Sequence, residues 1–397
     1  DIGITATAKT ASAAGTALNI TSNDATGLLQ ALNSANTASD STVVTALNNA
    51  LQQINGSTTA TATAAAKQLA PQQDLIVGSS AALKANTGSL QSVMSNRMAS
   101  LRSGDAYVAG MSAGDGVSAN SMFMQAYGSI VQQDDKIVGS GHQSGYDADT
   151  AGVAFGVDGI TDGGLVMGLS VSMANTDLEG KGTGNAKNDI DSYAASIYMD
   201  KTGDAGYVEG SVTFGISENA SSRVVNTLGI DRTYKGDYDT QQVSVKIGGG
   251  LPYEAQNGAY VTPFASLTGT LIESDAYTET SSANNDALRI RYDQDDINSI
   301  VGTIGLKAHY DTGNGVPMIS LSVNNEFGDT DVVTTNTYQG GGTAFKTTTA
   351  IEEMSATLGL GYTFTNGNTD VNVGVEAEAN NDDYFGGYGN VKVTSRF

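Results

Sequence analysis

The chain has 397 residues, a formal net charge of −23 at pH 7 and no cysteine. The lack of cysteine excludes a disulfide framework, a thiolate metal site and a thiol nucleophile, and the negative charge argues against nucleic-acid binding, which needs a basic surface. No run approaches the roughly eighteen apolar residues of a membrane-spanning helix. The 49 glycines exceed the usual share of about 7%, which is typical of a chain with many strands that each have one polar face.

Residues 1–85 are rich in Ala, Thr, Ser and Asn and almost lack aromatic residues. The spacing of apolar residues predicts a helix over Asp40–Asn55 and a shorter one over Asp24–Ala35. An Ala-rich stretch predicts a third helix over Thr59–Ala70, which Pro71 ends. We therefore expect this region to be partly helical.

The clearest helix signal follows at Thr87–Arg102, where Thr87 is a candidate N-cap. Apolar residues and one arginine recur there at steps of three and four residues: Leu90, Val93, Met94, Arg97, Met98 and Leu101. Periodicity alone is equally consistent with a surface helix packed on a neighbouring element.

From Ser118 onward the hydropathy has a period of two, which is typical of strands with one apolar and one polar face. Leu169 and Val171, for example, alternate with Ser170. Alternation and turn residues predict twelve strands. Their ranges are 120–132, 146–159, 164–176, 189–200, 205–218, 238–253, 259–273, 296–310, 316–328, 352–365, 369–380 and 386–397.

The connections between these strands alternate in length. Short turns follow the even-numbered strands, and longer loops follow most odd-numbered ones, which is the pattern of an outer-membrane barrel rather than of a soluble sandwich. In lipid every backbone polar group must be paired, so such a sheet has to close on itself. The predicted fold is all-β, a 12-stranded antiparallel transmembrane β-barrel with an N-terminal α-helical segment that threads the lumen.

No residue pattern predicts a catalytic, cofactor-binding or metal-binding site, and we expect no enzyme activity. Gly180–Gly184 lacks the spacing of a phosphate loop, and His142 and His309 have no third partner. Pairs of aspartates lack the spacing of a calcium loop. These acidic stretches are interpreted as solvated loops.

Several stretches resemble the translocator unit of type V secretion proteins, the monomeric autotransporters. They are GYDADTAGVAFGVDG (145–159), DIDSYAASIYM (189–199), YVTPFASLTGTLIESDAYTE (260–279), GGTAFK (341–346) and the C-terminal VKVTSRF. Upstream, KQLAPQQ followed by SLQSVMSNRMASLR resembles the helical linker of this family. The likeness extends from about residue 40 to the end of the chain.

The resemblance implies a barrel in the bacterial outer membrane that exports an N-terminal passenger, an adhesin or another surface protein, and anchors it at the cell surface. Residues 1–85 would be the end of the passenger or its junction, 86–117 the linker helix and pore segment, and 118–397 the barrel. The implied partners are outer-membrane lipid, the barrel-assembly machinery, periplasmic chaperones and the chain's own passenger, with the barrel as a monomer. Because the chain begins at Asp1 rather than Met, any signal peptide is expected upstream.

The resemblance also implies a role for the helix at Thr87–Arg102. Its length of about 24 Å, at 1.5 Å per residue, is close to the roughly 25 Å apolar band of such barrels. The pore helix would place these side chains in the lumen: Leu90, Val93, Met94, Arg97, Met98, Leu101 and Arg102. The candidate acidic partners of its two arginines are Glu209, Glu376 and Glu378.

Two further expectations follow from the likeness. Val391, Val393 and Phe397 match the C-terminal signal that the assembly machinery reads, although Ser395 departs from the pattern. Some family members cut their linker at an Asn-Asn pair, but Ser92-Val93 stands at that position, so we do not expect this reaction. The alternative function is a passive porin, which bilayer conductance would distinguish from a plugged translocator.

Overall fold

A computed structural model describes residues 20–37, 59–108, 121–138, 141–161, 163–227, 229–255, 258–283, 286–313, 315–351, 353–367, 369–380 and 384–396. The helix expected at Asp40–Asn55 and the terminal Phe397 lie outside this part of the chain. The helices are Ser22–Thr37 (α2), Thr59–Leu69 (α4) and Gln73–Val108 (α5). None of them combines the length and the hydropathy that a membrane-spanning helix needs.

The main sheet has 14 members, of which β9 (Tyr253–Glu254) and β12 (Thr280–Ser281) are two-residue strands at its margins. The other twelve are Ser121–Gln133 (β1), Tyr146–Ile160 (β4), Leu165–Gly180 (β5), Lys187–Thr202 (β6), Tyr207–Thr227 (β7), Ile230–Gly250 (β8), Ala259–Ser274 (β10), Ile297–Tyr310 (β14), Val316–Glu326 (β15), Met354–Asn366 (β18), Thr369–Ala379 (β19) and Tyr384–Arg396 (β20). The remaining strands are Lys136–Val138 (β2), Gly141–Gln143 (β3), Tyr277–Thr278 (β11), Ile290–Gln294 (β13), Asp331–Tyr338 (β16) and Phe345–Ala350 (β17).

The twelve long strands close into an antiparallel barrel, which confirms the predicted fold. Each pairs with its neighbours in the chain, and β20 pairs with β1 in a register that sets Ser121 opposite Arg396. We call this β1–β20 pairing the barrel seam. A closed sheet leaves no row of unpaired backbone groups toward lipid.

Short turns and long loops gather at opposite ends of this barrel. The start of β1 and the end of β20 lie at the end with the short turns, which we call the short-turn mouth. The long loops form a separate four-stranded sheet, β11-β13-β16-β17, at the other end, the long-loop mouth. In outer-membrane barrels short turns face the periplasm and long loops face the outside.

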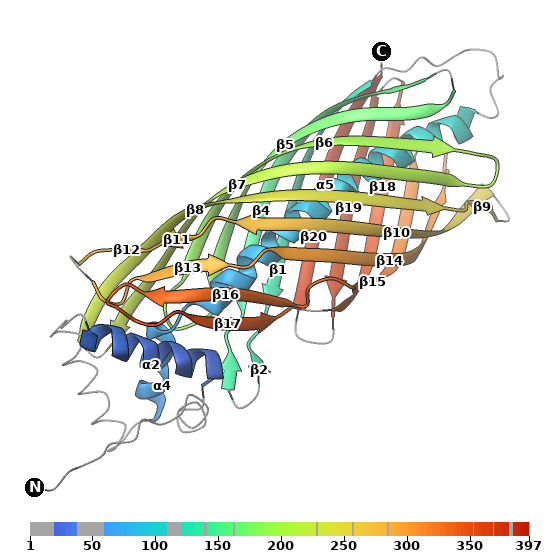
Figure 1. Cartoon of the computed structure of the whole chain (residues 1–397). Helices are drawn as coiled ribbons and strands as arrows, with labels where there is room; N and C mark the ends of the chain where they lie inside the picture. The colour runs from blue at the N-terminus through green and yellow to red at the C-terminus, as the bar shows by residue number, and fades with distance from the viewer. Residues whose placement is uncertain are drawn as a thin grey trace, which may run out of the picture.

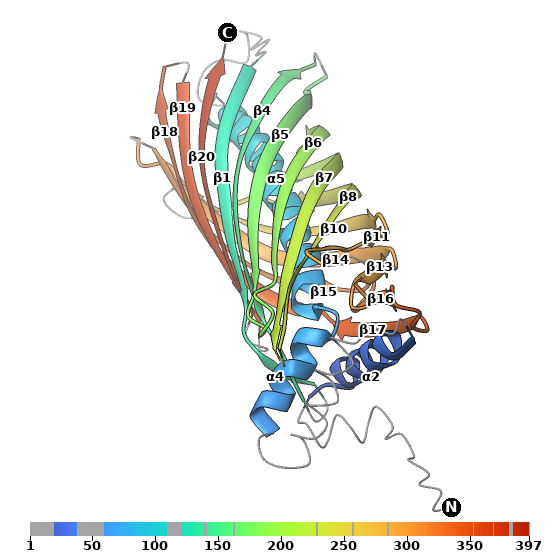
Figure 2. The same cartoon turned by 90° about the vertical axis from the view of Figure 1, so that its left-hand side faces the viewer.

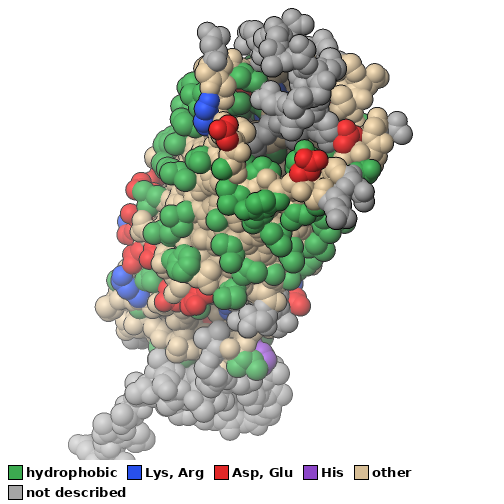
Figure 3. Space-filling view, turned by 90° about the vertical axis from the view of Figure 1, so that its right-hand side faces the viewer, with side chains coloured by type: hydrophobic (Ala, Val, Ile, Leu, Met, Phe, Trp, Pro, Cys, Tyr) green, Lys and Arg blue, Asp and Glu red, His purple; other side chains and the backbone are tan. Residues whose placement is uncertain are grey.

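The outward face has an apolar band that ends before the strands do. On β5, Leu169, Val171 and Met173 are more than half exposed, but the next outward positions are Asn175 and Asp177. Hydrophobic side chains accordingly cover the flank of the barrel in Figure 3. Because a polar outward face is unfavourable in lipid, the strands continue past the membrane toward the long-loop mouth.

Helix α5 runs through the interior of the barrel, whereas α2 and α4 lie at the long-loop mouth (Figures 1 and 2). The helix predicted at Thr87–Arg102 is longer at both ends than expected, since it spans Gln73–Val108. Thr87 is therefore not an N-cap but lies inside the helix, where it accepts a hydrogen bond from Gln242 of β8. The helices expected at Asp24–Ala35 and Thr59–Ala70 correspond to α2 and α4.

Strands β7 and β8 are also longer than predicted. Each has 21 residues, and their pairing continues to Thr227 opposite Ile230. The sequence pattern predicts a loop over most of Glu218–Asp237, where the structure has a hairpin. The alternation of apolar and polar residues fades there because both faces of this hairpin lie outside the membrane band.

Candidate functional site: the helix in the barrel lumen

The apolar stripe of α5 packs against one side of the lumen wall. Leu90, Val93, Met94 and Met98 are buried in a cluster with wall residues of β1, β4, β5 and β6. The wall contributes three aromatic rings and two small residues: Phe123, Tyr127, Tyr198, Ala154 and Ala174. The lumen is thus apolar where the helix rests, although most of its wall is polar.

Arg97 is the centre of a buried polar cluster on this stripe. Its Nε and one terminal nitrogen each donate to a carboxylate oxygen of Asp158 on β4, both over 2.6 Å. The side chain of Arg97 is 1% exposed and that of Asp158 is fully buried. Tyr198 of β6 donates to the same carboxylate over 2.8 Å. A bidentate arginine–carboxylate pair fixes both the distance and the orientation of its partners.

The same guanidinium spans the barrel seam. Arg97 donates to the hydroxyl of Ser121 on β1 and, over 3.4 Å, to that of Thr394 on β20. Ser121 in turn donates to Asp158. One side chain of the helix therefore joins the first, second and last barrel strands at the short-turn mouth.

Toward the N-terminal end of α5 from Arg97, serine and glutamine side chains of the helix bond polar groups of β7 and β8. Ser95 donates to Glu209 of β7 over 2.8 Å and accepts from Lys246 of β8 over 3.0 Å. Gln91 donates to Ser244 of β8 over 2.7 Å. These bonds extend the contact surface of the helix from β1 across to β8.

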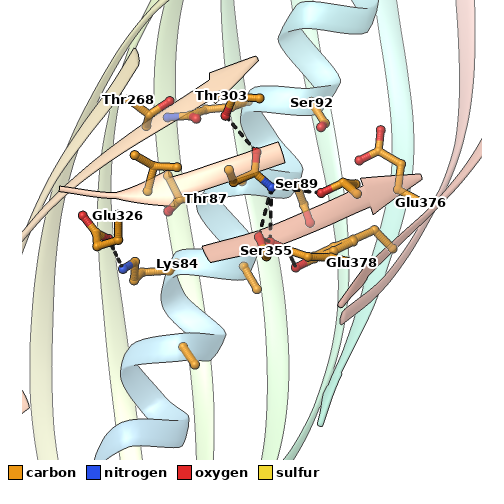
Figure 4. A pocket seen from close by; sticks show the side chains of 18 of the residues that line it. Lys84, Thr87, Ser89, Ser92, Thr268, Thr303, Glu326, Ser355, Glu376 and Glu378 are labelled. Atoms are coloured by element: carbon orange, nitrogen blue, oxygen red, sulfur yellow. Dashed lines mark hydrogen bonds and ion pairs between the residues drawn. The ribbon is translucent and has the colours of Figure 1, made fainter. Parts of the chain in front are cut away.

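The opposite side of the lumen is only partly filled. A cavity of about 390 Å³ lies between α5 and the wall formed by β10, β14, β15, β18 and β19. Lys84 of α5 reaches across to Glu326 of β15 over 2.8 Å, and Glu376 and Glu378 of β19 lie on the cavity wall (Figure 4). Glu378 accepts hydrogen bonds from Ser355 and Tyr388.

The N-terminal end of α5 is held by Asp74 in its first turn. Asp74 accepts from the backbone N–H of Leu75 over 2.9 Å and from that of Gly182, in the β5–β6 loop, over 3.1 Å. Burial raises the pKa of the Asp74 carboxyl to about 6, and the nearby carboxylate of Asp24 adds to the rise. This group lies beyond the apolar band, at the long-loop mouth.

The structure brings together only some of the predicted site residues. Of the seven pore-helix residues, six are buried in the lumen, and the side chain of Arg102 lies outside the described part. The expectation that Arg97 pairs with Glu209, Glu376 or Glu378 is wrong, since its partner is Asp158. Val391 and Val393 face outward, whereas Lys392 and Thr394 between and beyond them are buried on the lumen side.

The sequence pattern did not single out Asp158, Tyr198 and Lys84. A signal for Asp158 existed, because it is an acidic residue on the inward parity of a predicted strand. Several other acidic residues share that property, and parity does not distinguish among them. Within the described ranges, no three His, Asp or Glu side chains form a group that could hold a metal ion.

A closed 12-stranded antiparallel sheet with an apolar outer band and a helix in its lumen defines an outer-membrane β-barrel. The family model for the autotransporter β-domain matches residues 122–390. The chain therefore belongs to the autotransporter β-domain family, and it is an outer-membrane translocator domain.

Curated relatives are outer membrane proteins of Rickettsia. Outer membrane protein B of Rickettsia typhi is 27% identical over 237 residues, which is 55% of this chain and 14% of that protein. Outer membrane protein A of Rickettsia conorii is 30% identical over 147 residues, 34% of this chain and 7% of that protein. The chain thus spans only a small part of the length of these relatives.

Among solved structures, the translocator domain of the autotransporter NalP from Neisseria meningitidis has a similar fold. Its TM-score is 0.58 at 17% identity, and the match covers 79% of this chain and 98% of that chain. At this identity the likeness concerns the fold alone. It agrees with the closed barrel described above.

Proposed function

We propose that the barrel exports an N-terminal passenger, an adhesin or another surface protein, and then anchors it through α5. In this assignment residues 1–85 are the end or junction of the passenger, 86–117 the pore segment and 118–397 the barrel. The observation that carries the proposal is the direction of α5. Its N-terminal end lies at the long-loop mouth beside Gly182, and its C-terminal part, at Arg97, bonds to the start of β1 at the short-turn mouth.

An anchor has to resist being pulled through the pore. The Arg97–Asp158 pair, the Lys84–Glu326 pair and the buried stripe around Met94 hold α5 at several heights of the wall. Each contact fixes the axial position of the helix, because a shift of one turn would move it by about 5.4 Å and break all of them together.

Export is tested in cells that produce the chain behind a reporter passenger. We expect the reporter to be digested by protease added outside the cells. The single substitution Val393→Asp should make the barrel assemble poorly. This residue faces lipid and is proposed to belong to the assembly signal. A reporter that stays protected in cells with fully assembled barrels would contradict the export role.

The alternative function, a passive porin, predicts high and steady conductance in planar bilayers. The cavity of about 390 Å³ beside α5 favours at most a small conductance while the helix is in place. Removal of residues 87–102 should open the pore and raise the conductance strongly. Equal conductance with and without this segment would favour the porin.

A further inference from the structure

The long-loop mouth carries a folded unit that lies outside the membrane band. It consists of the sheet β11-β13-β16-β17 and the ends of β7 and β8, which join it through β12 and the β7–β8 hairpin. Helices α2 and α4 pack on this unit, α2 on β16 and β17 and α4 on β7. We call the strands the platform and the two helices the cap.

The cap and the platform share an apolar core. The cap supplies mostly small residues, among them Ala25, Ala31 and Ala35, which are fully buried. The platform supplies larger ones, and the loop before β13 adds a leucine: Tyr234, Ile290, Tyr338 and Phe345, with Leu288 from the loop. Small residues on a helix let large side chains approach closely, so the two surfaces are complementary in shape.

The platform also recognises the C-terminal end of α4. The last carbonyls of a helix have no partner within it and carry a partial negative charge. Arg223 of β7 donates to the carbonyl of Gln68 over 3.2 Å, and the Tyr338 hydroxyl donates to that of Leu69. These are contacts to a helix end rather than nonspecific apolar packing.

Arg223 is itself rigidly held. Its Nε and one terminal nitrogen donate to the two carboxylate oxygens of Glu279, over 2.6 and 2.8 Å, and its guanidinium carbon lies 4.2 Å from the centre of the Tyr234 ring. Burial alone would lower the pKa of Arg223, but the Glu279 carboxylate raises it well above its usual value. The donor is therefore charged and fixed at any ordinary pH.

The cap precedes α5 in the chain, whereas the platform belongs to the barrel that follows it. We propose that the platform is a receptor for the cap, and that their docking forms a latch that keeps the passenger junction outside once it has crossed. This inference rests on the proposed export role. The latch acts on residues 20–37 and 59–69 and complements the contacts of α5 in the lumen.

Docking is tested by a disulfide in this cysteine-free chain. A Cβ at Gly342 would lie 3.7 Å from the Cβ of Ser34, close to the separation of about 3.8 Å in disulfides. The double variant Ser34→Cys/Gly342→Cys should form an intramolecular disulfide in the complete, folded protein. Ser34→Cys/Gly203→Cys is the control and should not, because Gly203 lies in the β6–β7 turn at the short-turn mouth.

Adding Ala31→Asp to the Ser34→Cys/Gly342→Cys variant should reduce disulfide formation by at least about tenfold, because a carboxylate would be buried without a partner. Tyr338→Phe removes only the bond to Leu69 and should give a smaller reduction. The control Ile137→Asp adds the same charge at an exposed position of the same mouth and should change nothing. Retained heat-modifiable mobility on gels shows that each barrel has folded.

The latch predicts that Ala31→Asp lowers the yield of surface-exposed passenger several-fold in pulse–chase experiments, while Ile137→Asp leaves it unchanged. If the folded Ser34→Cys/Gly342→Cys variant forms no disulfide, the docked cap is refuted. If the disulfide is lost on addition of Ala31→Asp but export is unchanged, the latch is refuted and export stands. A disulfide without any export by the unaltered chain overturns the export role and the latch together.

Discussion

Replacement of Arg97 by Met should destabilise the barrel more than any other single change in the helix. The substitution leaves the carboxylate of Asp158 in a fully buried site, with the hydroxyls of Ser121 and Tyr198 as hydrogen-bond donors and the buried Lys392 as a nearby positive charge. Removing one partner of a buried ion pair typically costs about 3–5 kcal/mol, because the other charge stays buried. The bond to Thr394 across the seam is lost as well.

The free energy of unfolding is measured by urea titration of the refolded protein in detergent, followed by far-ultraviolet circular dichroism, since the chain has no tryptophan. The double variant Arg97→Met/Asp158→Asn should recover much of the loss because it removes both charges. The control is Arg291→Met, whose ion pair with Asp293 is about half exposed and should contribute at most about 1 kcal/mol. Equal stability of Arg97→Met and the unaltered chain, or a double variant as unstable as the single one, would refute this reasoning.

Three further predictions concern the barrel wall and the N-terminal end of α5. Leu321→Arg, at a lipid-facing position that is 57% exposed, should cost about 2–4 kcal/mol of folding free energy in refolding assays in lipid. Ser322→Arg, which faces the cavity, should cost far less. Equal costs would contradict the assigned faces. Gly168→Ala should cost about 1–3 kcal/mol in the urea assay, because its Cβ would overlap with the Tyr198 ring. An unchanged midpoint would contradict this packing. The folded-state pKa of Asp74 is raised to about 6, so its carboxyl should make the fold more stable as the pH falls from 7 toward 5, by about 1.4 kcal/mol per pH unit below that pKa. Asp74→Asn should lose this gain. An identical pH dependence of protease resistance in both proteins would contradict the prediction.

The barrel was predictable from the sequence because its constraint is local. Lipid on one side and polar groups on the other impose a period of two on each strand, and this period located all twelve barrel strands. The stripe from Leu90 to Leu101 was predictable for the same reason, since one face of α5 meets an apolar wall. The prediction failed at the ends of β7 and β8, which lie beyond the membrane, because no lipid imposes an apolar outward face there and the period of two fades.

The partners of the helix depended on tertiary structure. The sequence indicated that Arg97 would meet an acidic residue of the lumen. Which residue it meets depends on the rotation and depth of α5 and on the stagger of the closed sheet. These bring Asp158 to the guanidinium and leave Glu376 and Glu378 across the cavity. The docking of α2 and α4 on the platform likewise joins residues far apart in the chain, such as Ser34 and Ala287. Local periodicity specifies which face of an element is apolar, whereas the choice of what that face contacts is made only when the barrel closes around its helix.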